Sequence, residues 1–122
     1  MKTILVVEDL SAAQQFLRET LESKGYETLG ATNCNQAYDI LNNHSQRINL
    51  VLTDYNIPEK SGLELLSKIK ANPDLKKIPV IFLTAETNPD IIKKAEQIGF
   101  NSWIKKPYRS DVLMNEIETA LK

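Results

Sequence analysis

LVLTD, at residues 50–54, is a short run of apolar residues that ends in a carboxylate. Two comparable runs, ILVV at residues 4–7 and VIFL at residues 80–83, are also too brief for a helix and are bounded by polar or turn residues. Such runs indicate buried β-strands. Residues 27–31 and 102–104 have a more mixed composition, which is typical of edge or near-edge strands. The sequence therefore predicts five strands.

The stretches between these runs carry apolar residues at helical spacing, which predicts five amphipathic helices. Their apolar positions are, in chain order, Ala13, Phe16, Leu17 and Leu21; Cys34, Ala37, Ile40 and Leu41; Leu65, Leu66 and Ile69; Ile91, Ala95 and Ile98; and Leu113, Ile117, Ala120 and Leu121. Strict alternation of strand and helix implies right-handed crossovers and a parallel sheet covered by helices on both faces. The predicted fold class is α/β.

The predicted helix starts also carry capping signals. In a capping box, a cap residue is followed three positions later by Glu or Gln, and each caps a backbone N–H at the helix start. Pairs with this spacing are Ser11 with Gln14, Asn33 with Gln36, and Ser61 with Glu64. Asn88 followed by Pro89 is another typical start, because Pro suits the first helical position.

Composition limits the classes of protein that this chain can represent. With 122 residues, 42% apolar and 25% charged, it has the size of one compact domain spanning residues 1–122. A net charge of -1 gives no global attraction for nucleic acid or an anionic membrane, so we expect neither direct nucleic-acid binding nor membrane association. The single Cys34 excludes an internal disulfide and suits a reducing compartment, so we expect a cytoplasmic location.

Polar residues follow four of the predicted strands. Glu8 and Asp9 follow the first, Asp54 the third, Thr84 the fourth and Lys106 the fifth. Because ligands bind beyond the carboxyl ends of strands in an open parallel sheet, we expect these side chains to share one rim. Taken singly each has an ordinary interpretation, since an Asp at a strand end most often caps a turn or helix. Their joint placement is what indicates a site.

Three carboxylates at one rim repel one another, and a hard divalent cation removes that repulsion. Mg²⁺ takes a few oxygen ligands and commonly shares its coordination with phosphate oxygens. The sequence offers no His or Cys cluster for zinc, since its single His44 lies elsewhere. Asp54 is then a plausible nucleophile toward phosphorus, with Thr84 and Lys106 holding the oxygens of the bound phosphoryl group.

Four motifs resemble the receiver family of two-component signalling, over essentially the whole chain: ILVVED at residues 4–9, LVLTDYNIPEKSG at 50–62, PVIFLTA at 79–85 and WIKKP at 103–107. The resemblance implies a single receiver domain with a flavodoxin-like (βα)5 fold, a three-layer sandwich whose parallel five-stranded sheet has the strand order 2-1-3-4-5. It also implies a signalling switch of the response-regulator type, similar to chemotaxis regulators, that catalyses only its own phosphorylation and slow dephosphorylation.

The family pattern, carried over by position, makes Asp54 the phosphoacceptor. It gives Asp9, Asp54 and the backbone carbonyl of Asn56 as Mg²⁺ ligands, with Glu8, where Asp is more frequent, acting through metal-bound water. Thr84 and Lys106 would contact the phosphoryl group. The peptide bond before Pro107 is usually cis in this family.

The resemblance also implies partners and a switch. The donor would be a sensor histidine kinase or a histidine phosphotransfer protein, and a downstream protein would recognise the face formed by the fourth helix, fifth strand and fifth helix. Trp103 occupies the place of the family's switch aromatic, where Tyr or Phe is more usual, and pairs with Thr84. We further hypothesise that Asn56 and Glu86, each two positions beyond a site residue, set the lifetime of the phosphorylated form.

Two rival functions use related folds. A Mg²⁺-dependent phosphohydrolase with an Asp nucleophile usually needs a general acid two residues after it, where this chain has Asn56. A pseudo-receiver or nucleotide-binding module would show lost site residues or a phosphate-cradling loop after the first strand, where Glu8 and Asp9 would repel phosphate. The sequence also leaves open whether the domain is free-standing or part of a larger regulator or hybrid kinase.

Overall fold

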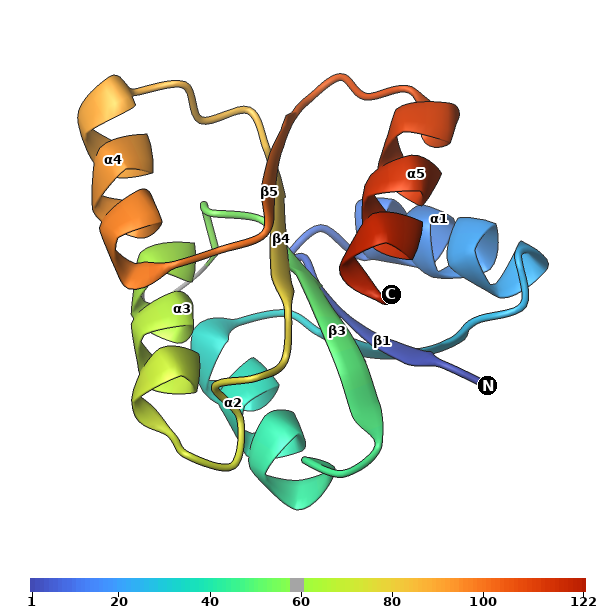
Figure 1. The fold of residues 1–122 in the computed structure, drawn as a ribbon. Coiled ribbons are helices and arrows are strands. Elements are labelled where there is room, and N and C mark those ends of the chain that lie inside the picture. The colour runs from blue at the N-terminus through green and yellow to red at the C-terminus, as the bar shows by residue number, and fades with distance from the viewer. Residues whose placement is uncertain (58–60) are drawn as a thin grey trace.

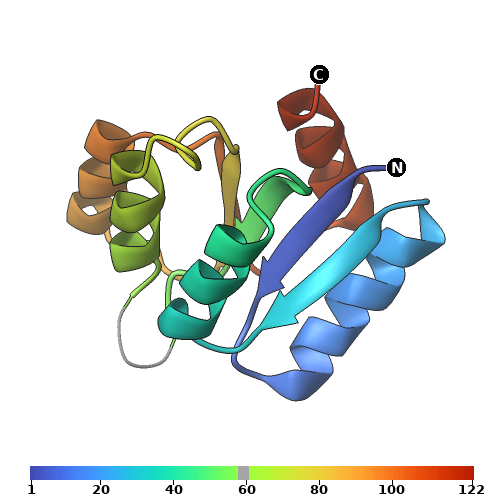
Figure 2. The same cartoon turned by 90° about the horizontal axis from the view of Figure 1, so that it is seen from below.

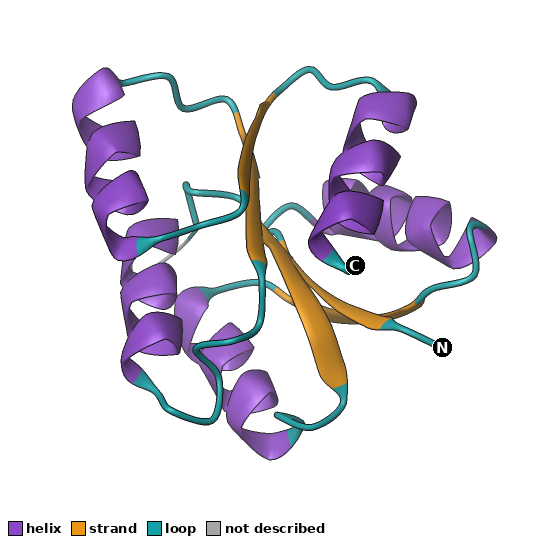
Figure 3. Cartoon of the chain, viewed as in Figure 1, coloured by secondary structure: helices purple, strands orange, loops and turns teal. Residues whose placement is uncertain are grey.

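The computed structural model describes residues 1–57 and 61–122; residues 58–60, which fall within the motif around Asp54, lie outside the described residues. Strands and helices alternate along the described chain as predicted (Figures 1 and 3). Their bounds are β1 (Thr3–Val7), α1 (Ser11–Ser23), β2 (Glu27–Ala31), α2 (Cys34–Asn43), β3 (Ile48–Thr53), α3 (Gly62–Ala71), β4 (Val80–Thr84), α4 (Pro89–Ile98), β5 (Ser102–Lys105) and α5 (Ser110–Ala120).

The strands form one parallel sheet in the order β2-β1-β3-β4-β5, which confirms both the α/β class and the order implied by the resemblance. The sheet is seen close to edge-on in Figure 1, with α2, α3 and α4 on one side and α1 and α5 on the other; Figure 2 shows the same layers from below. The molecule is therefore the expected three-layer sandwich, with the carboxyl ends of all five strands at one edge.

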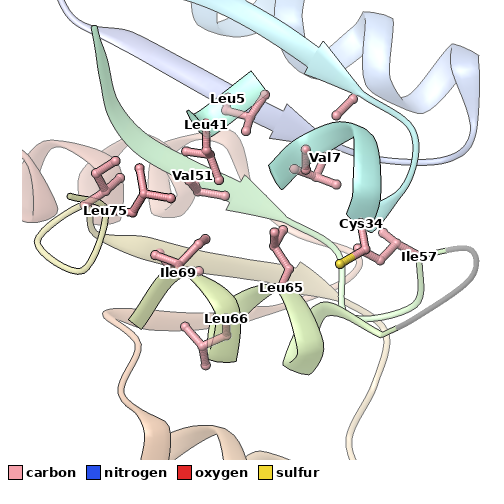
Figure 4. Close-up of a cluster of buried hydrophobic side chains, with 14 of the residues drawn as sticks. Leu5, Val7, Cys34, Leu41, Val51, Ile57, Leu65, Leu66, Ile69 and Leu75 are labelled. Atoms are coloured by element: carbon pink, nitrogen blue, oxygen red, sulfur yellow. The ribbon is translucent and has the colours of Figure 1, made fainter. Parts of the chain in front are cut away.

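Each face of the sheet has its own apolar core because alternate strand residues point in opposite directions. Leu5 and Val7 of β1 belong to the core beneath α2, α3 and α4, whereas Ile4 and Val6 belong to the core beneath α1 and α5. The first core, drawn in Figure 4, includes side chains from both β3 and α3. Near-complete burial of these strands explains why they read as continuous apolar runs in the sequence.

Two of the predicted helix starts are confirmed. The Asn33 side chain accepts a hydrogen bond from the backbone N–H of Gln36, and Asn88 accepts one from Asp90 with Pro89 at the first helical position. Both side chains satisfy backbone donors that a helix start leaves without an intrahelical partner.

Two expectations about the helices were wrong, and a third holds only in part. Ser11 is the first residue of α1 and not its cap, and the cap position falls on Leu10, whose side chain cannot accept a hydrogen bond. Phe16 was expected on the buried face of α1, but it is 61% exposed while its neighbour Leu17 is only 6% exposed. At the start of α3, Ser61 does hold the cap position, but its side chain makes no capping hydrogen bond.

No helix among the described residues is long and apolar enough to cross a membrane.

Candidate functional site

Backbone hydrogen bonds continue the sheet one residue beyond the strands and so fix the height of the site residues. The N–H of Asp54 donates to the carbonyl of Val7 at 3.1 Å, and the N–H of Lys106 donates to the carbonyl of Thr84 at 2.9 Å. The N–H of Glu8 likewise donates to Ala31, at the end of β2, at 3.0 Å. Side chains that lie up to 98 residues apart in sequence are thereby brought to one rim.

At the centre of this rim, one ammonium group joins two carboxylates. Lys106 Nζ donates to Glu8 Oε1 at 3.0 Å and to Asp54 Oδ2 at 3.1 Å. The side chain of Glu8 is only 3% exposed and that of Asp54 13%. Asp54 Oδ1 accepts a further hydrogen bond from the backbone N–H of Asn56 at 3.1 Å. Both oxygens of Asp54 are therefore held in fixed directions.

Burial and charge act in opposite directions on this group of side chains. Burial raises the pKa of Glu8, and together with the charge of Asp54 and the hydrogen bond with Asp9 it outweighs the lowering effect of the hydrogen bond and charge of Lys106. Burial by itself would lower the pKa of Lys106, but hydrogen bonds to Glu8 and Asp54 and the charges of both carboxylates raise it overall. The ammonium therefore stays charged, whereas the buried Glu8 carboxylate is incompletely compensated.

The remaining predicted ligands lie at the edge of the site. Asp9 and Asn56 are both exposed, and the backbone N–H of Asp9 donates to Glu8 Oε2 at 3.1 Å. Within residues 1–57 and 61–122, no three His, Cys, Asp or Glu side chains form a ready-made metal cage. The available donors are nevertheless all oxygens, from carboxylates and a backbone carbonyl. This donor set suits Mg²⁺, which takes few protein ligands and keeps several waters.

Thr84 connects the site to the loop that follows β4. Its side chain is fully buried, and its hydroxyl oxygen accepts a hydrogen bond from the backbone N–H of Glu86 at 3.2 Å. The Glu86 carboxylate turns back onto its own loop and accepts from the backbone N–H groups of Thr87 and Asn88, both at 3.1 Å. Thr84 and Glu86 therefore set the shape of this loop together.

Trp103 reaches the same loop from β5. Its indole Nε1 donates to the backbone carbonyl of Glu86 at 3.1 Å, so the N–H of this partly buried ring, which is larger than the Tyr or Phe usual at this place, has a partner. The ring packs against Phe82, Phe100 and Tyr55, with centroids 4.8, 5.7 and 6.1 Å away. Trp103 is thus turned toward the core beneath α4, and Glu86 is held from one side by Thr84 and from the other by the indole.

Sequence reasoning assigned no role to Gly62, although it lies in the motif around Asp54. Its N–H donates to the carbonyl of Tyr55 at 2.6 Å, and α3 starts directly against the segment that follows Asp54. A Cβ at this position would lie 2.7 Å from the carbonyl oxygen of Asp54 and 2.8 Å from a ring carbon of Phe82. Glycine is therefore required for this close approach, and its place at the end of the quoted motif was the available signal.

Comparison with known proteins identifies the family. The family model described as "Response regulator receiver domain" matches residues 4–118. This chain belongs to the response regulator receiver family. A curated relative, the chemotaxis protein CheY of Pseudomonas aeruginosa, is 34% identical over 116 residues, covering 94% of this chain and 92% of that protein.

Solved structures agree with the assignment of this receiver domain. A response regulator receiver domain protein from Clostridium thermocellum superposes with a TM-score of 0.92 at 29% identity, covering 99% of this chain and 94% of that one. The Mn²⁺-bound form of the response regulator Rcp1 superposes with a TM-score of 0.80 at 31% identity, covering 99% and 90%. Receiver domains are switches of two-component signalling and not conventional enzymes, and the family generally binds Mg²⁺.

Proposed function

We propose that this receiver domain accepts a phosphoryl group on Asp54, in a Mg²⁺-dependent reaction, from a phosphohistidine of a sensor histidine kinase or of a histidine phosphotransfer protein. The observation that carries the proposal is the ion pair between Asp54 Oδ2 and Lys106 Nζ, 3.1 Å apart, at the carboxyl ends of the strands. A carboxylate that is both held in place and partly exposed can approach a phosphorus atom, because its attack direction is already set.

In the reaction, a carboxylate oxygen of Asp54 forms a bond to phosphorus, and the bond from phosphorus to the donor imidazole nitrogen breaks. The imidazole nitrogen keeps the electron pair of that bond, and because the other ring nitrogen carries a proton in the reacting phosphohistidine, the products are an acyl phosphate on Asp54 and a neutral donor histidine. Lys106 would move from the carboxylate to a phosphoryl oxygen, where an ammonium stabilises the charge that develops in transfer. The hydroxyl of Thr84 would donate a hydrogen bond to another phosphoryl oxygen.

We assign the cation site to the carboxylates of Asp9 and Asp54 and the backbone carbonyl of Asn56, with Glu8 acting through metal-bound water. When bound, Mg²⁺ would neutralise the charge of the phosphoryl oxygens. The raised pKa of Glu8 supports this assignment, because a buried carboxylate with incomplete compensation gains from a nearby cation.

The switch would run through the loop after β4. If Thr84 turns its hydroxyl to the phosphoryl group, it no longer accepts from the N–H of Glu86, whose carbonyl is the partner of Trp103. Phosphorylation would then favour a second arrangement of this loop and of the face formed by α4, β5 and α5. A downstream protein would recognise that face. A shift from mostly inactive to mostly active requires a differential stabilisation of about 5 kcal/mol.

The experiment that tests the proposal is intact mass after incubation with acetyl phosphate, with and without Mg²⁺. Wild type and the exposed-carboxylate control Asp39→Asn should each gain one phosphoryl group only when Mg²⁺ is present, and Asp54→Asn should gain none. A lack of uptake in wild type would favour the pseudo-receiver interpretation. Steady turnover of a small phosphate ester such as p-nitrophenyl phosphate would favour the phosphohydrolase.

A further inference from the structure

The side-chain amide of Gln14, in the first part of α1, binds the segment that carries Glu8 and Asp9. Its Nε2 donates to the backbone carbonyl of Glu8 at 3.0 Å and to the backbone carbonyl of Ala31 at 2.9 Å. The same Ala31 carbonyl also accepts from the N–H of Glu8. One amide therefore fastens the segment after β1 to the end of β2.

The bond to Glu8 matters because of the peptide unit to which that carbonyl belongs. The carbonyl of Glu8 and the N–H of Asp9 are the two ends of a single planar peptide group. Gln14 holds the carbonyl end, and Glu8 Oε2 holds the N–H end at 3.1 Å. With both ends held, the plane is kept from turning, and so the position of the Asp9 Cα, from which its carboxylate reaches out, is fixed.

Gly30 of β2 provides the space in which this amide lies. A Cβ at position 30 would lie 2.3 Å from Oε1 of Gln14 and 2.9 Å from an Nη atom of Arg18. Real Cβ atoms do not approach so closely, so any side chain at this position would displace the Gln14 amide. Gly30 and Gln14 therefore act as one fitted pair, on different elements, next to the proposed cation site.

We propose that Gln14 is a positioning residue for the divalent cation: by fixing the peptide between Glu8 and Asp9, it directs the Asp9 carboxylate toward the metal. The inference rests on the proposed function, because it takes Asp9 as a ligand. Gln14 itself touches neither the metal nor the phosphoryl group in this scheme, and its effect is transmitted through the backbone.

Cation affinity is the property to measure, and Mn²⁺ is the probe because it prefers oxygen ligands and its free form is counted by electron paramagnetic resonance. Gln14→Ala and Gln14→Met, which keeps the length of the side chain but lacks the donor, should each raise the Kd for Mn²⁺ about tenfold, as loss of groups that orient ligands commonly does. Gln15→Ala is the matched control, because the side chain of Gln15, on the same helix, bonds to the exposed Glu19 and to no other side chain among the described residues.

The fitted pair allows a second test that general damage to the fold would not reproduce. Gly30→Ala should weaken Mn²⁺ binding by a similar factor even though Gln14 is still present. The double variant Gln14→Ala with Gly30→Ala should then bind no more weakly than the weaker single variant, because both changes remove the same interaction. Denaturant unfolding without metal reports any separate loss of stability.

The outcomes distinguish failure of the positioning role of Gln14 from failure of the proposed function. A Kd for Mn²⁺ equal to that of wild type in both Gln14 variants would overturn the positioning role. So would a double variant whose increase in Kd is the product of the two single increases. Loss of stability with unchanged Kd would mean that the amide serves the fold alone. Absence of Mn²⁺ binding in wild type would instead overturn the proposed function, and this inference with it.

Discussion

Lys106 Nζ lies 3.0 Å from Glu8 Oε1 and 3.1 Å from Asp54 Oδ2, so a single ammonium group holds together the carboxylates at the ends of β1 and β3. Removing it would leave two carboxylates, one of them buried, facing each other without a cation. Such a pair is costly because neither charge is compensated and the charged forms repel.

Lys106→Met should therefore lower the free energy of unfolding in EDTA by about 1–3 kcal/mol. Added Mg²⁺ should stabilise this variant more than it stabilises wild type, because the cation replaces the missing charge. Denaturant unfolding with EDTA or with Mg²⁺ measures both effects. Lys105→Met, which changes the exposed neighbour, should stay within about 0.5 kcal/mol of wild type. Equal losses in the two variants would show that the bridge has no role in stability.

Trp103 is the only tryptophan, so its emission reports the state of the loop after β4. Phosphorylation with acetyl phosphate should change that emission, because release of Glu86 by the Thr84 hydroxyl disturbs the carbonyl that binds the indole. Asp54→Asn under the same conditions should show no change. If wild type carries the phosphoryl group by mass and its emission is unaltered, then Trp103 does not take part in the switch.

Asn56 and Glu86 should set how long the phosphoryl group persists. Asn56 is exposed and lies two residues after Asp54. The carboxylate of Glu86 accepts hydrogen bonds from two backbone N–H groups of the loop after β4. Asn56→Ala and Glu86→Ala should each shorten the lifetime severalfold, because truncation opens the approach of water to the acyl phosphate. The measurement is the decay of the phosphorylated mass after acetyl phosphate is removed. Glu96→Ala, an exposed position on α4, is the control. Decay rates equal to wild type would refute the hypothesis.

The strands and the joint placement of the site residues were predictable because both depend on short-range signals. LVLTD is apolar over the length of one strand and then stops, and this stop alone puts Asp54 at the rim of a parallel sheet. The strand order came from the resemblance to a family, since no local pattern records which strands are neighbours. The structure then confirmed the order.

What the sequence could not show depends on contacts between distant segments. Ser11 and Gln14 have capping-box spacing, but the Gln14 side chain is engaged by carbonyls of Glu8 and Ala31, the latter 17 residues away. Likewise, nothing local shows that Gly30 would leave room for a glutamine from α1. These arrangements follow from tertiary packing, which overrides the local pattern.

Phe16 shows the same limit and gives a direct test. Helical spacing put it on the buried face of α1 with Leu17, yet the two residues are 61% and 6% exposed. Leu17→Ala should lower the free energy of unfolding by about 2–5 kcal/mol, because it leaves a cavity in the core beneath α1. Phe16→Ser should change it by less than about 1 kcal/mol, as expected for an exposed position. Similar losses in both variants would mean that Phe16 is buried in solution.

Glycine is needed at position 62 because a side chain would clash there, and at position 25 because the backbone has a positive φ. Gly62→Ala places a methyl group 2.7 Å from the backbone oxygen of Asp54, which cannot yield without moving the segment after β3. This variant should lose about 1–3 kcal/mol in unfolding free energy and should also take up phosphate from acetyl phosphate more slowly. A Cβ at Gly25 would meet nothing within 4 Å, but φ there is +94°, so Gly25→Ala should lose about 1 kcal/mol and keep the wild-type rate of uptake. A Gly62→Ala protein with normal uptake would show that the start of α3 does not position Asp54.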